Sequence, residues 1–232
     1  MVKVAIAVLK QNPKGFFLMV EGGRIDHACH ANDPAGTVGD MMDFDNAVKL
    51  GIYLSKQDPD TLILVGGDHE TGGMAMGIGG MKGDKYRGYF MKPEAIKNSR
   101  RSMEFMGYTA ASGNPDESKN IFIKFSGISD LTAEETVEIE KASELTKAKK
   151  GMQSPNPYLE PWYGVVFADI ISKRARVGWT SYAHTGQPVI MSAAGPGSEK
   201  FSGFYDNTDI TKNVAALWGI TLKTWQLGAA KE

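Results

Sequence analysis

The sequence predicts an α/β fold, specifically an α/β/α sandwich in which helices cover both faces of one sheet and an irregular, helical subdomain is inserted. Three largely apolar runs of strand length carry this prediction, at residues 16–20, 61–65 and 189–193. Strands buried on both faces lack the alternation of apolar and polar residues that half-exposed strands show. A helical pattern separates the first two runs, and a strand–helix–strand unit of this kind forms a right-handed parallel crossover. We therefore expect all three runs to share one sheet.

The first predicted element is an amphipathic helix. Val2, Ile6 and Leu9 lie on one stripe of this helix, and residues 12–15 end it. The segment has neither the cationic region nor the small-residue cleavage site of a secretory signal peptide. We expect the chain to start within a domain, with the first strand beginning at residue 16.

The second predicted helix starts at a capping signal. Asp33 is a preferred N-cap residue and Pro34 suits the first helical position, after which apolar residues recur at helical spacing until residues 58–60 end the helix. The second predicted strand follows. In open α/β sheets, ligands bind beyond the carboxyl ends of the strands. Two clusters of charged residues and glycines, at residues 21–30 and 66–73, occupy this position after the first and second strands.

Mixed helical and irregular patterns mark the middle of the chain as a variable insertion or lid. A capping-box pattern at residues 132–135 predicts a helix toward Lys147, and another helix is expected from Pro161 through Ile171. A final helix is expected at residues 209–218. The predicted organisation is a first part of the core at residues 1–75, the insertion at residues 76–177 and the C-terminal part of the core at residues 178–232.

The composition excludes several classes of protein. The 26 basic residues balance 27 acidic ones, and a pI near 6.4 lacks the basic excess of a protein that binds phosphate backbones. The apolar runs are far shorter than the roughly 20 residues of a spanning helix. Cys29 is the single cysteine, so no intrachain disulfide can form. We therefore expect neither a nucleic-acid partner nor a membrane span.

All four histidines stand in polar clusters close to predicted strands. The clusters are Asp26-His27-Ala28-Cys29-His30, Asp68-His69 and Tyr182-Ala183-His184-Thr185-Gly186. Asp26 and His30 are four residues apart, so one helical turn would place both on one face, where they could share a small cation. Mixed His and Asp ligation suits zinc and similar metals. Glu21 is a carboxylate at a strand end that could bind magnesium.

Each of these signals also has a purely structural explanation. An Asp and a His at this spacing commonly form a surface pair or a helix cap, and Glu21 before two glycines can be a turn residue. The adjacent pair Asp68-His69 is common by chance. Taken together, however, acidic residues and histidines confined to strand ends, beside glycines that permit close backbone approach, favour one convergent site.

Three sequence blocks resemble the second half of an alkaline phosphatase. They are residues 15–30, 67–73 and 184–186, and they follow one another in the family's order. The resemblance implies two zinc ions and one magnesium ion. It implies that one zinc is held by Asp26, His30 and His184, that the second is held in part by Asp68 and His69, and that the magnesium is held in part by Glu21. His27 falls at a variable position near the phosphate and magnesium site, where a supporting role is expected.

The resemblance also implies a function and its limits. It implies hydrolysis of phosphate monoesters through a phosphoserine intermediate, an extracytoplasmic location and a homodimer. The family's nucleophilic serine and phosphate-binding arginine precede the strand that corresponds to residues 16–20, and nothing here resembles the Asp-Ser-Ala nucleophile motif. We therefore predict no catalytic residue in this chain, and expect a C-terminal fragment that is inactive alone. A phosphodiesterase or sulfatase of the same superfamily, or a non-catalytic metal-binding fragment, are the alternatives.

Overall fold

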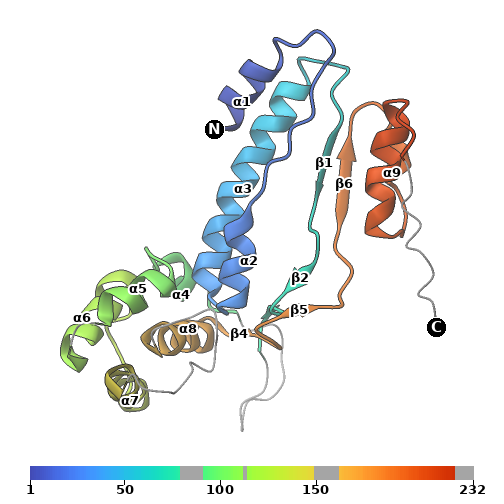
Figure 1. Ribbon diagram of the computed structural model, residues 1–232. Coiled ribbons are helices and arrows are strands. Elements are labelled where there is room, and N and C mark those ends of the chain that lie inside the picture. Colours follow the sequence, from blue (N-terminus) through green and yellow to red (C-terminus); the bar gives the residue numbers. More distant parts are fainter. Residues whose placement is uncertain (79–90, 112–113, 149–161, 223–232) are drawn as a thin grey trace.

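The computed structural model describes residues 1–78, 91–111, 114–148 and 162–222. A long helix, α3 (Pro34–Ser55), stands in the middle, with a group of helices on one side and a narrow sheet on the other (Figure 1). Helix α1 (Val2–Leu9) lies at one end of α3, and α2 (Gly23–His30) lies beside its other end. Within the described ranges, no helix is both long enough and apolar enough to span a bilayer.

Two of the three predicted strands share a sheet. Strand β1 (Ile63–Gly66) pairs with β6 (Met191–Ala194) in an antiparallel ladder that runs from Ile63 opposite Ala194 to Gly66 opposite Met191. Two shorter antiparallel ladders form separate two-stranded sheets. Strand β2 (Glu70–Thr71) pairs with β5 (His184–Thr185), and β3 (Ala75–Met76) pairs with β4 (Val177–Gly178).

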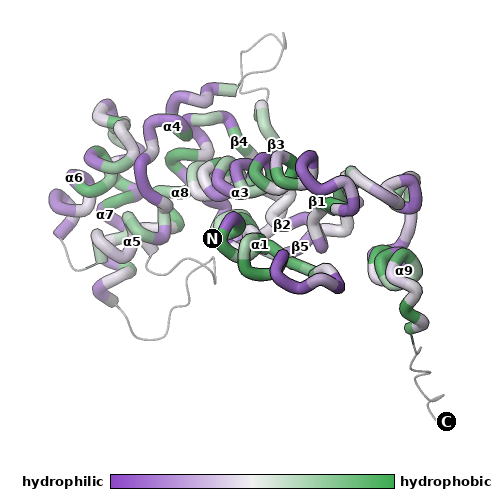
Figure 2. The backbone as a smooth tube through the Cα atoms, turned by 90° about the horizontal axis from the view of Figure 1, so that it is seen from above, coloured by the Kyte–Doolittle hydropathy of each residue, from purple (hydrophilic) through white to green (hydrophobic). Residues whose placement is uncertain are grey.

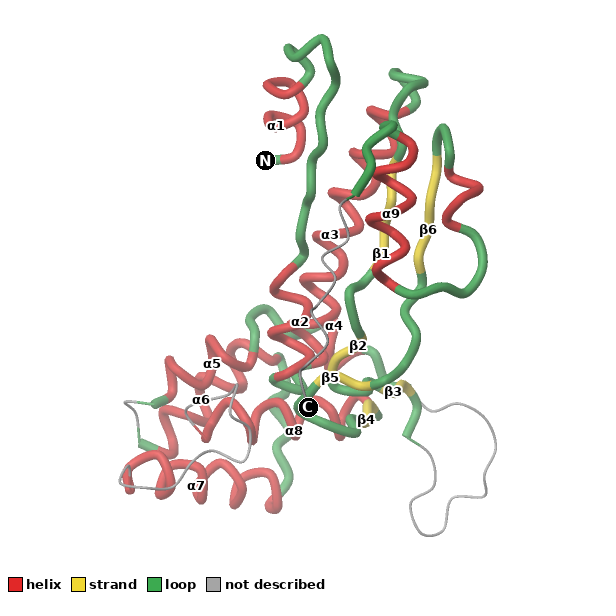
Figure 3. The backbone as a smooth tube through the Cα atoms, turned by 45° about the vertical axis from the view of Figure 1, so that its right-hand side comes forward, coloured by secondary structure: helices red, strands yellow, loops and turns green. Residues whose placement is uncertain are grey.

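The prediction of a strand at residues 16–20 is wrong. This segment is an extended connection between α1 and α2 (Figure 3), and no backbone hydrogen bond joins it to a strand in the part of the chain that is described. Phe17 is 64% exposed and Met19 is 70% exposed. An apolar run becomes a strand only where a neighbouring strand accepts and donates its backbone hydrogen bonds. The expected parallel crossover is therefore absent from the described residues, and the observed ladders are antiparallel.

The hydrophobic core lies among the helices of the predicted insertion. These helices are α4 (Glu94–Lys97), α5 (Met103–Ala110), α6 (Pro115–Ser126), α7 (Ala133–Ala148) and α8 (Trp162–Ala175). The largest side chains that they bury, each at most 1% exposed, are Met103, Met106, Phe122, Ile139, Tyr163 and Phe167. The segment expected to be a lid is therefore the best packed part of the described chain.

The helix predictions in this region are confirmed where they can be followed. The backbone N–H of Thr132 donates to Glu135 Oε2 at 2.9 Å, and the N–H of Glu135 donates to Thr132 Oγ1 at 3.2 Å, so the predicted capping box opens α7. Helix α8 continues four residues beyond the predicted end, and Pro161 lies outside the described residues.

The C-terminal part carries a short 3-10 helix, η1 (Ser198–Phe201), and the predicted final helix, α9 (Asn207–Leu217). Asp206 is the N-cap of α9, because its carboxylate accepts from the backbone N–H of Thr208 at 2.9 Å. Figure 2 shows hydrophobic stretches along α1 and α9, outside the helical core. Val4 of α1 and Trp218 after α9 are 67% and 55% exposed, so these helices contribute little to the core.

One buried carboxylate joins the helical core to α3. Asp33 caps α3, its Oδ1 accepting from the N–H groups of Ala35 and Gly36 at 3.0 and 2.8 Å. Its Oδ2 accepts from the N–H of Met103, the first residue of α5, at 2.8 Å. Asp33 is 1% exposed, and a Cβ atom at Gly36 would lie only 2.6 Å from Oδ2. The same side chain therefore caps two helices and fixes α5 against the start of α3.

We predict a characteristic pH dependence from Asp33. Burial raises the pKa of Asp33 from an ordinary 3.8 to about 6, although the three N–H donors act in the opposite direction. The stabilising contribution of the protonated carboxyl is thus complete below pH 3.8 and is lost as the pH rises through about 6. Relative to Asp33→Asn, the wild type should lose on the order of 3 kcal/mol in urea-measured stability between pH 4 and 7.

Asp206→Asn is the matched control for this prediction. The backbone hydrogen bond from Thr208 lowers the pKa of Asp206, so its contribution should have the opposite sign and be lost as the pH falls. If the stability difference between wild type and Asp33→Asn rose with pH, the N–H donors would outweigh burial and the prediction would be wrong.

Candidate metal centre

Three of the predicted ligands converge where α2 meets β5. His30 Nε2 lies 3.5 Å from Asp26 Oδ2 and 3.2 Å from His184 Nε2, and His184 Nε2 lies 3.8 Å from Asp26 Oδ1. Asp26 and His30 share one face of α2, as their spacing predicts, whereas His184 comes from a strand 154 residues further along the chain. His30 is 7% exposed, and the other two side chains are more open to solvent.

A glycine holds the segment before His184 against α2. The N–H of Gly72 donates to the carbonyl of Ala183 at 3.0 Å, and the carbonyl of Gly72 accepts from the N–H groups of Thr180 and Ser181. Gly72 has φ +83°, and a Cβ atom there would lie 2.9 Å from the carbonyl oxygen of Cys29. Only glycine combines this backbone conformation with so close an approach to α2. The close approach explains how His184 reaches the ligands on α2.

The backbone fixes the tautomer of His30. Its Nδ1 lies 2.6 Å from the carbonyl oxygen of Tyr182, which can only accept a hydrogen bond. Nδ1 therefore carries the hydrogen, and the lone pair of the neutral ring is on Nε2, the atom that lies close to Asp26 and His184. Metal-binding histidines are commonly oriented by such a hydrogen bond to a carbonyl.

A hydroxyl that the sequence did not single out connects the two predicted zinc ligand sets. Thr71 Oγ1 donates to Asp26 Oδ1 at 2.6 Å and lies 3.1 Å from His69 Nδ1. Since the single hydroxyl hydrogen is used on Asp26, His69 Nδ1 is the donor and the lone pair of the neutral His69 ring is on Nε2. Thr71 is 7% exposed and stands opposite His184 in the β2–β5 ladder. No local pattern marks Thr71, because its role depends on the pairing of distant strands.

The predicted second pair lies beside the first cluster. The rings of His69 and His184 stack with their centroids 3.5 Å apart, and Asp68 Oδ2 lies 3.3 Å from His69 Nε2. The side chain of Asp68 is 86% exposed. Two of the predicted ligands of a second metal are thus adjacent to the first three, on the side of the site that is open to solvent.

Glu21 and His27 lie outside the cluster. Glu21 is exposed, with Oε1 above the first turn of α2, 3.0 Å from where a Cβ atom of Gly23 would stand. His27 is also exposed, and its Nδ1 lies 3.4 Å from Nη1 of Arg24. The structure therefore brings together Asp26, His30 and His184, whereas Glu21 is exposed in the connection before α2 and His27 is exposed on α2.

The cluster has the dimensions of a zinc site. Ligand atoms about 2.0–2.1 Å from a tetrahedral zinc stand roughly 3.3–3.4 Å from one another. The two imidazole nitrogens are 3.2 Å apart, and the Asp26 carboxylate approaches them at 3.5 Å through Oδ2 and at 3.8 Å through Oδ1. With one carboxylate oxygen taken as the ligand atom, the three ligand atoms lie within 4.8 Å of one another. Two imidazole nitrogens and one carboxylate oxygen are a common donor set for catalytic zinc, and they leave one coordination position for a fourth ligand.

The family model for alkaline phosphatase matches residues 1–220. The chain belongs to the alkaline phosphatase family. It is 36% identical to alkaline phosphatase 4 of Bacillus subtilis over 205 residues, covering 88% of this chain and 40% of that protein. It is also 36% identical to alkaline phosphatase 3 of the same organism, covering 92% of this chain and 42% of that protein.

A solved structure of this family has a similar fold. Thermus thermophilus alkaline phosphatase matches with a TM-score of 0.78 and 27% identity, over 96% of this chain and 47% of that chain. The chain thus spans about two fifths of the length of these curated relatives and about half of the solved alkaline phosphatase chain. The family resemblance inferred from the three sequence blocks is confirmed, and so is the α/β class.

We predict that Thr71 controls metal affinity through its hydrogen bonds. Thr71→Val keeps the shape of the side chain but removes the hydrogen bonds to Asp26 and His69, so zinc affinity measured by calorimetry should fall roughly 10- to 100-fold. Thr71→Ser keeps the hydroxyl and should bind zinc like the wild type. Equal affinities for the Val and Ser variants would show that the hydroxyl does not orient the ligands.

Proposed function

We propose that this chain supplies most of the metal ligands of a phosphate monoesterase active site of the alkaline phosphatase kind. The observation that carries the proposal is the convergence of Asp26, His30 and His184, whose ligand atoms lie within 4.8 Å of one another. Family membership supplies the reaction class, hydrolysis of phosphate monoesters. Because the chain spans less than half of its curated relatives, the activity is proposed for a polypeptide that also contains the family's nucleophilic serine.

Each predicted ligand has a role in this proposal. Asp26, His30 and His184 hold one zinc, and Asp68 and His69 contribute two ligands to a second. Two zinc ions held by these residues would supply electrostatic stabilisation of the charge that develops during phosphoryl transfer. Glu21 contributes one ligand to a magnesium ion, and its exposed position leaves it accessible to ligands from elsewhere in the polypeptide.

The chain's own contribution is to hold the ligand atoms before metal or substrate arrives. The carbonyl of Tyr182 fixes the tautomer of His30, and the hydroxyl of Thr71 orients Asp26 and His69 together. Pre-formed ligand sets lose less conformational entropy when they bind. The phosphoserine intermediate, the extracytoplasmic location and the homodimer that the resemblance implies are part of the same proposal.

We predict that this chain binds zinc through the three converging residues. His184→Ala and Asp26→Asn should each lower zinc affinity in calorimetry by more than the roughly 10- to 100-fold that loss of a ligand-orienting hydrogen bond costs. Asp209→Asn is the matched control for Asp26→Asn, since it removes a partly exposed carboxylate that pairs with Lys212 on α9, outside the metal cluster. Titrations of His184→Ala and wild type that cannot be distinguished would contradict the assignment.

We predict that the chain alone does not turn over a phosphomonoester. Loss of a nucleophile from a cooperating active site costs several orders of magnitude in rate. A chimera that joins this chain to the unmatched part of Bacillus subtilis alkaline phosphatase 4 should hydrolyse p-nitrophenyl phosphate, and His184→Ala should abolish that activity. A phosphodiester substrate serves as the control for reaction class.

Two outcomes would contradict this prediction. Turnover by the isolated chain, free of host phosphatase, at about 1 s⁻¹ or more would place a nucleophile within these residues. A folded, zinc-loaded chimera that hydrolyses only the diester would exclude the monoesterase assignment.

A further inference from the structure

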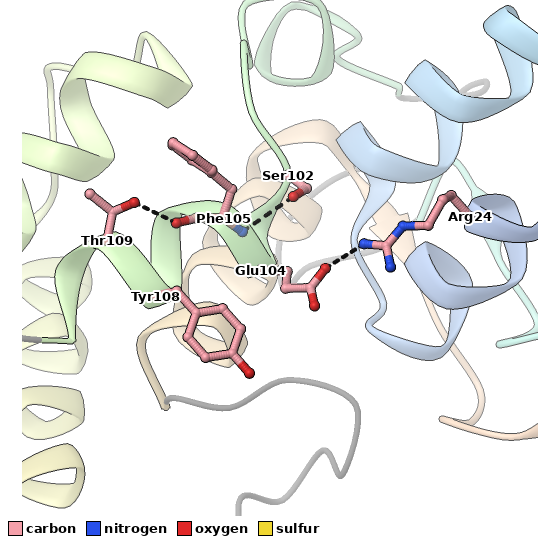
Figure 4. Close-up of a pocket in the computed structure, with 6 residues that line it drawn as sticks. All are labelled: Arg24, Ser102, Glu104, Phe105, Tyr108 and Thr109. Carbon is pink, nitrogen blue, oxygen red and sulfur yellow. Dashed lines mark hydrogen bonds and ion pairs between the residues drawn. The ribbon is translucent and has the colours of Figure 1, made fainter.

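An ion pair joins the helical core to the helix that carries the metal ligands. Nη2 of Arg24, on α2, lies 2.5 Å from Oε2 of Glu104, on α5 (Figure 4). The two side chains border an open hollow of about 530 Å³, which is also lined by Ser102, Phe105, Tyr108 and Thr109. The contact therefore bridges two elements that are 80 residues apart in the sequence.

Hydrogen bonds at the start of α5 fix the position of Glu104. It follows Met103, whose backbone N–H donates to the buried carboxylate of Asp33. Ser102 caps the same helix end by accepting from the N–H of Phe105 at 3.2 Å. A carboxylate in the first turn of a helix is also stabilised by the helix dipole. Glu104 is thus held at a defined place beside α2, although its side chain is partly exposed.

The other end of Arg24 contacts a predicted site residue. Nη1 of Arg24 lies 3.4 Å from Nδ1 of His27. A guanidinium group has only donors, so Nδ1 of His27 must be the accepting nitrogen. The hydrogen of the neutral imidazole is then on Nε2. His27 directly follows Asp26, a member of the metal cluster, on α2.

We infer that Glu104 and Arg24 are positioning residues for His27. The ion pair from α5 holds the guanidinium against Nδ1, and this contact fixes both the ring orientation and the Nε2–H tautomer. On the proposed function, on which this last step rests, His27 then offers Nε2–H as a hydrogen-bond donor from the helix position that follows the ligand Asp26. The helical core thereby takes part in shaping the site through one chain of contacts.

This role differs from stabilising the fold. Exposed ion pairs contribute little to stability because solvent screens them and ordering the side chains costs entropy. The side chains of Arg24 and Glu104 are 59% and 39% exposed. Removing the ion pair should therefore change the tautomer of His27 and leave the urea unfolding midpoint unchanged.

The test is the tautomer of His27 in the metal-free chain, measured by long-range ¹H–¹⁵N correlation NMR at pH 8, above the ordinary imidazole pKa of about 6.5. The His27 signals are assigned by their loss in His27→Gln. The wild type should show the hydrogen on Nε2 alone. Arg24→Met and Glu104→Ala should each give a mixture of the two tautomers, with urea unfolding midpoints like that of the wild type.

Lys212→Met is the matched control, because Lys212 and Asp209 form an ion pair of similar length and exposure on α9, 2.6 Å and 60%/38%. It should leave His27 unchanged. A mixture of tautomers already present in the wild type would overturn the inference. A change of the His27 tautomer in Arg24→Met but not in Glu104→Ala would also overturn it. Arg24 would then orient His27 without help from the ion pair with Glu104 on α5. Neither result depends on phosphatase activity, which the chimera tests separately.

Discussion

Three backbone N–H groups converge on the buried carboxylate of Asp33, and the rest of the described structure depends on this interaction. Two of these N–H groups belong to the first turn of α3, and the third begins α5. Each helix end has N–H groups without partners inside the helix, and a buried N–H without a partner is costly. By satisfying both ends with one side chain, the chain links the packed helices of its core to α3, and α2 lies directly beside that end of α3.

The metal centre is built on this junction from contacts between distant segments. Helix α2 places Asp26 and His30 on one face, and Gly72 draws the segment before His184 against α2. The β2–β5 ladder then sets Thr71 opposite His184, where its hydroxyl can orient Asp26 and His69. The β2–β5 ladder is only two residues long and offers few backbone hydrogen bonds. The hydrogen bonds of Gly72 and Thr71 therefore help to hold His69 and His184 near one another.

The two halves of the described structure differ in how well they are packed. The helical core buries Phe122, Tyr163 and Phe167 almost completely. The side that carries the sheet leaves apolar residues in solvent, including Phe17 and Ile190, which are 64% and 84% exposed. Hydrophobic burial therefore stabilises mainly the helices, whereas the metal centre depends on directed hydrogen bonds. Arg24 and Glu104 lie on the boundary between these two parts.

The sequence by itself determined the features that depend on neighbouring residues. The caps at Asp33 and Thr132, the helices that follow them, and the pairing of Asp26 with His30 all arise from spacings of a few residues, which helix geometry translates directly into position. Only the tertiary structure decided that residues 16–20 form no strand, that the predicted insertion holds the core, and that Thr71 and Glu104 contact the site or its neighbours. These outcomes depend on which distant segments supply backbone partners and cover apolar surface, and no local pattern encodes such contacts.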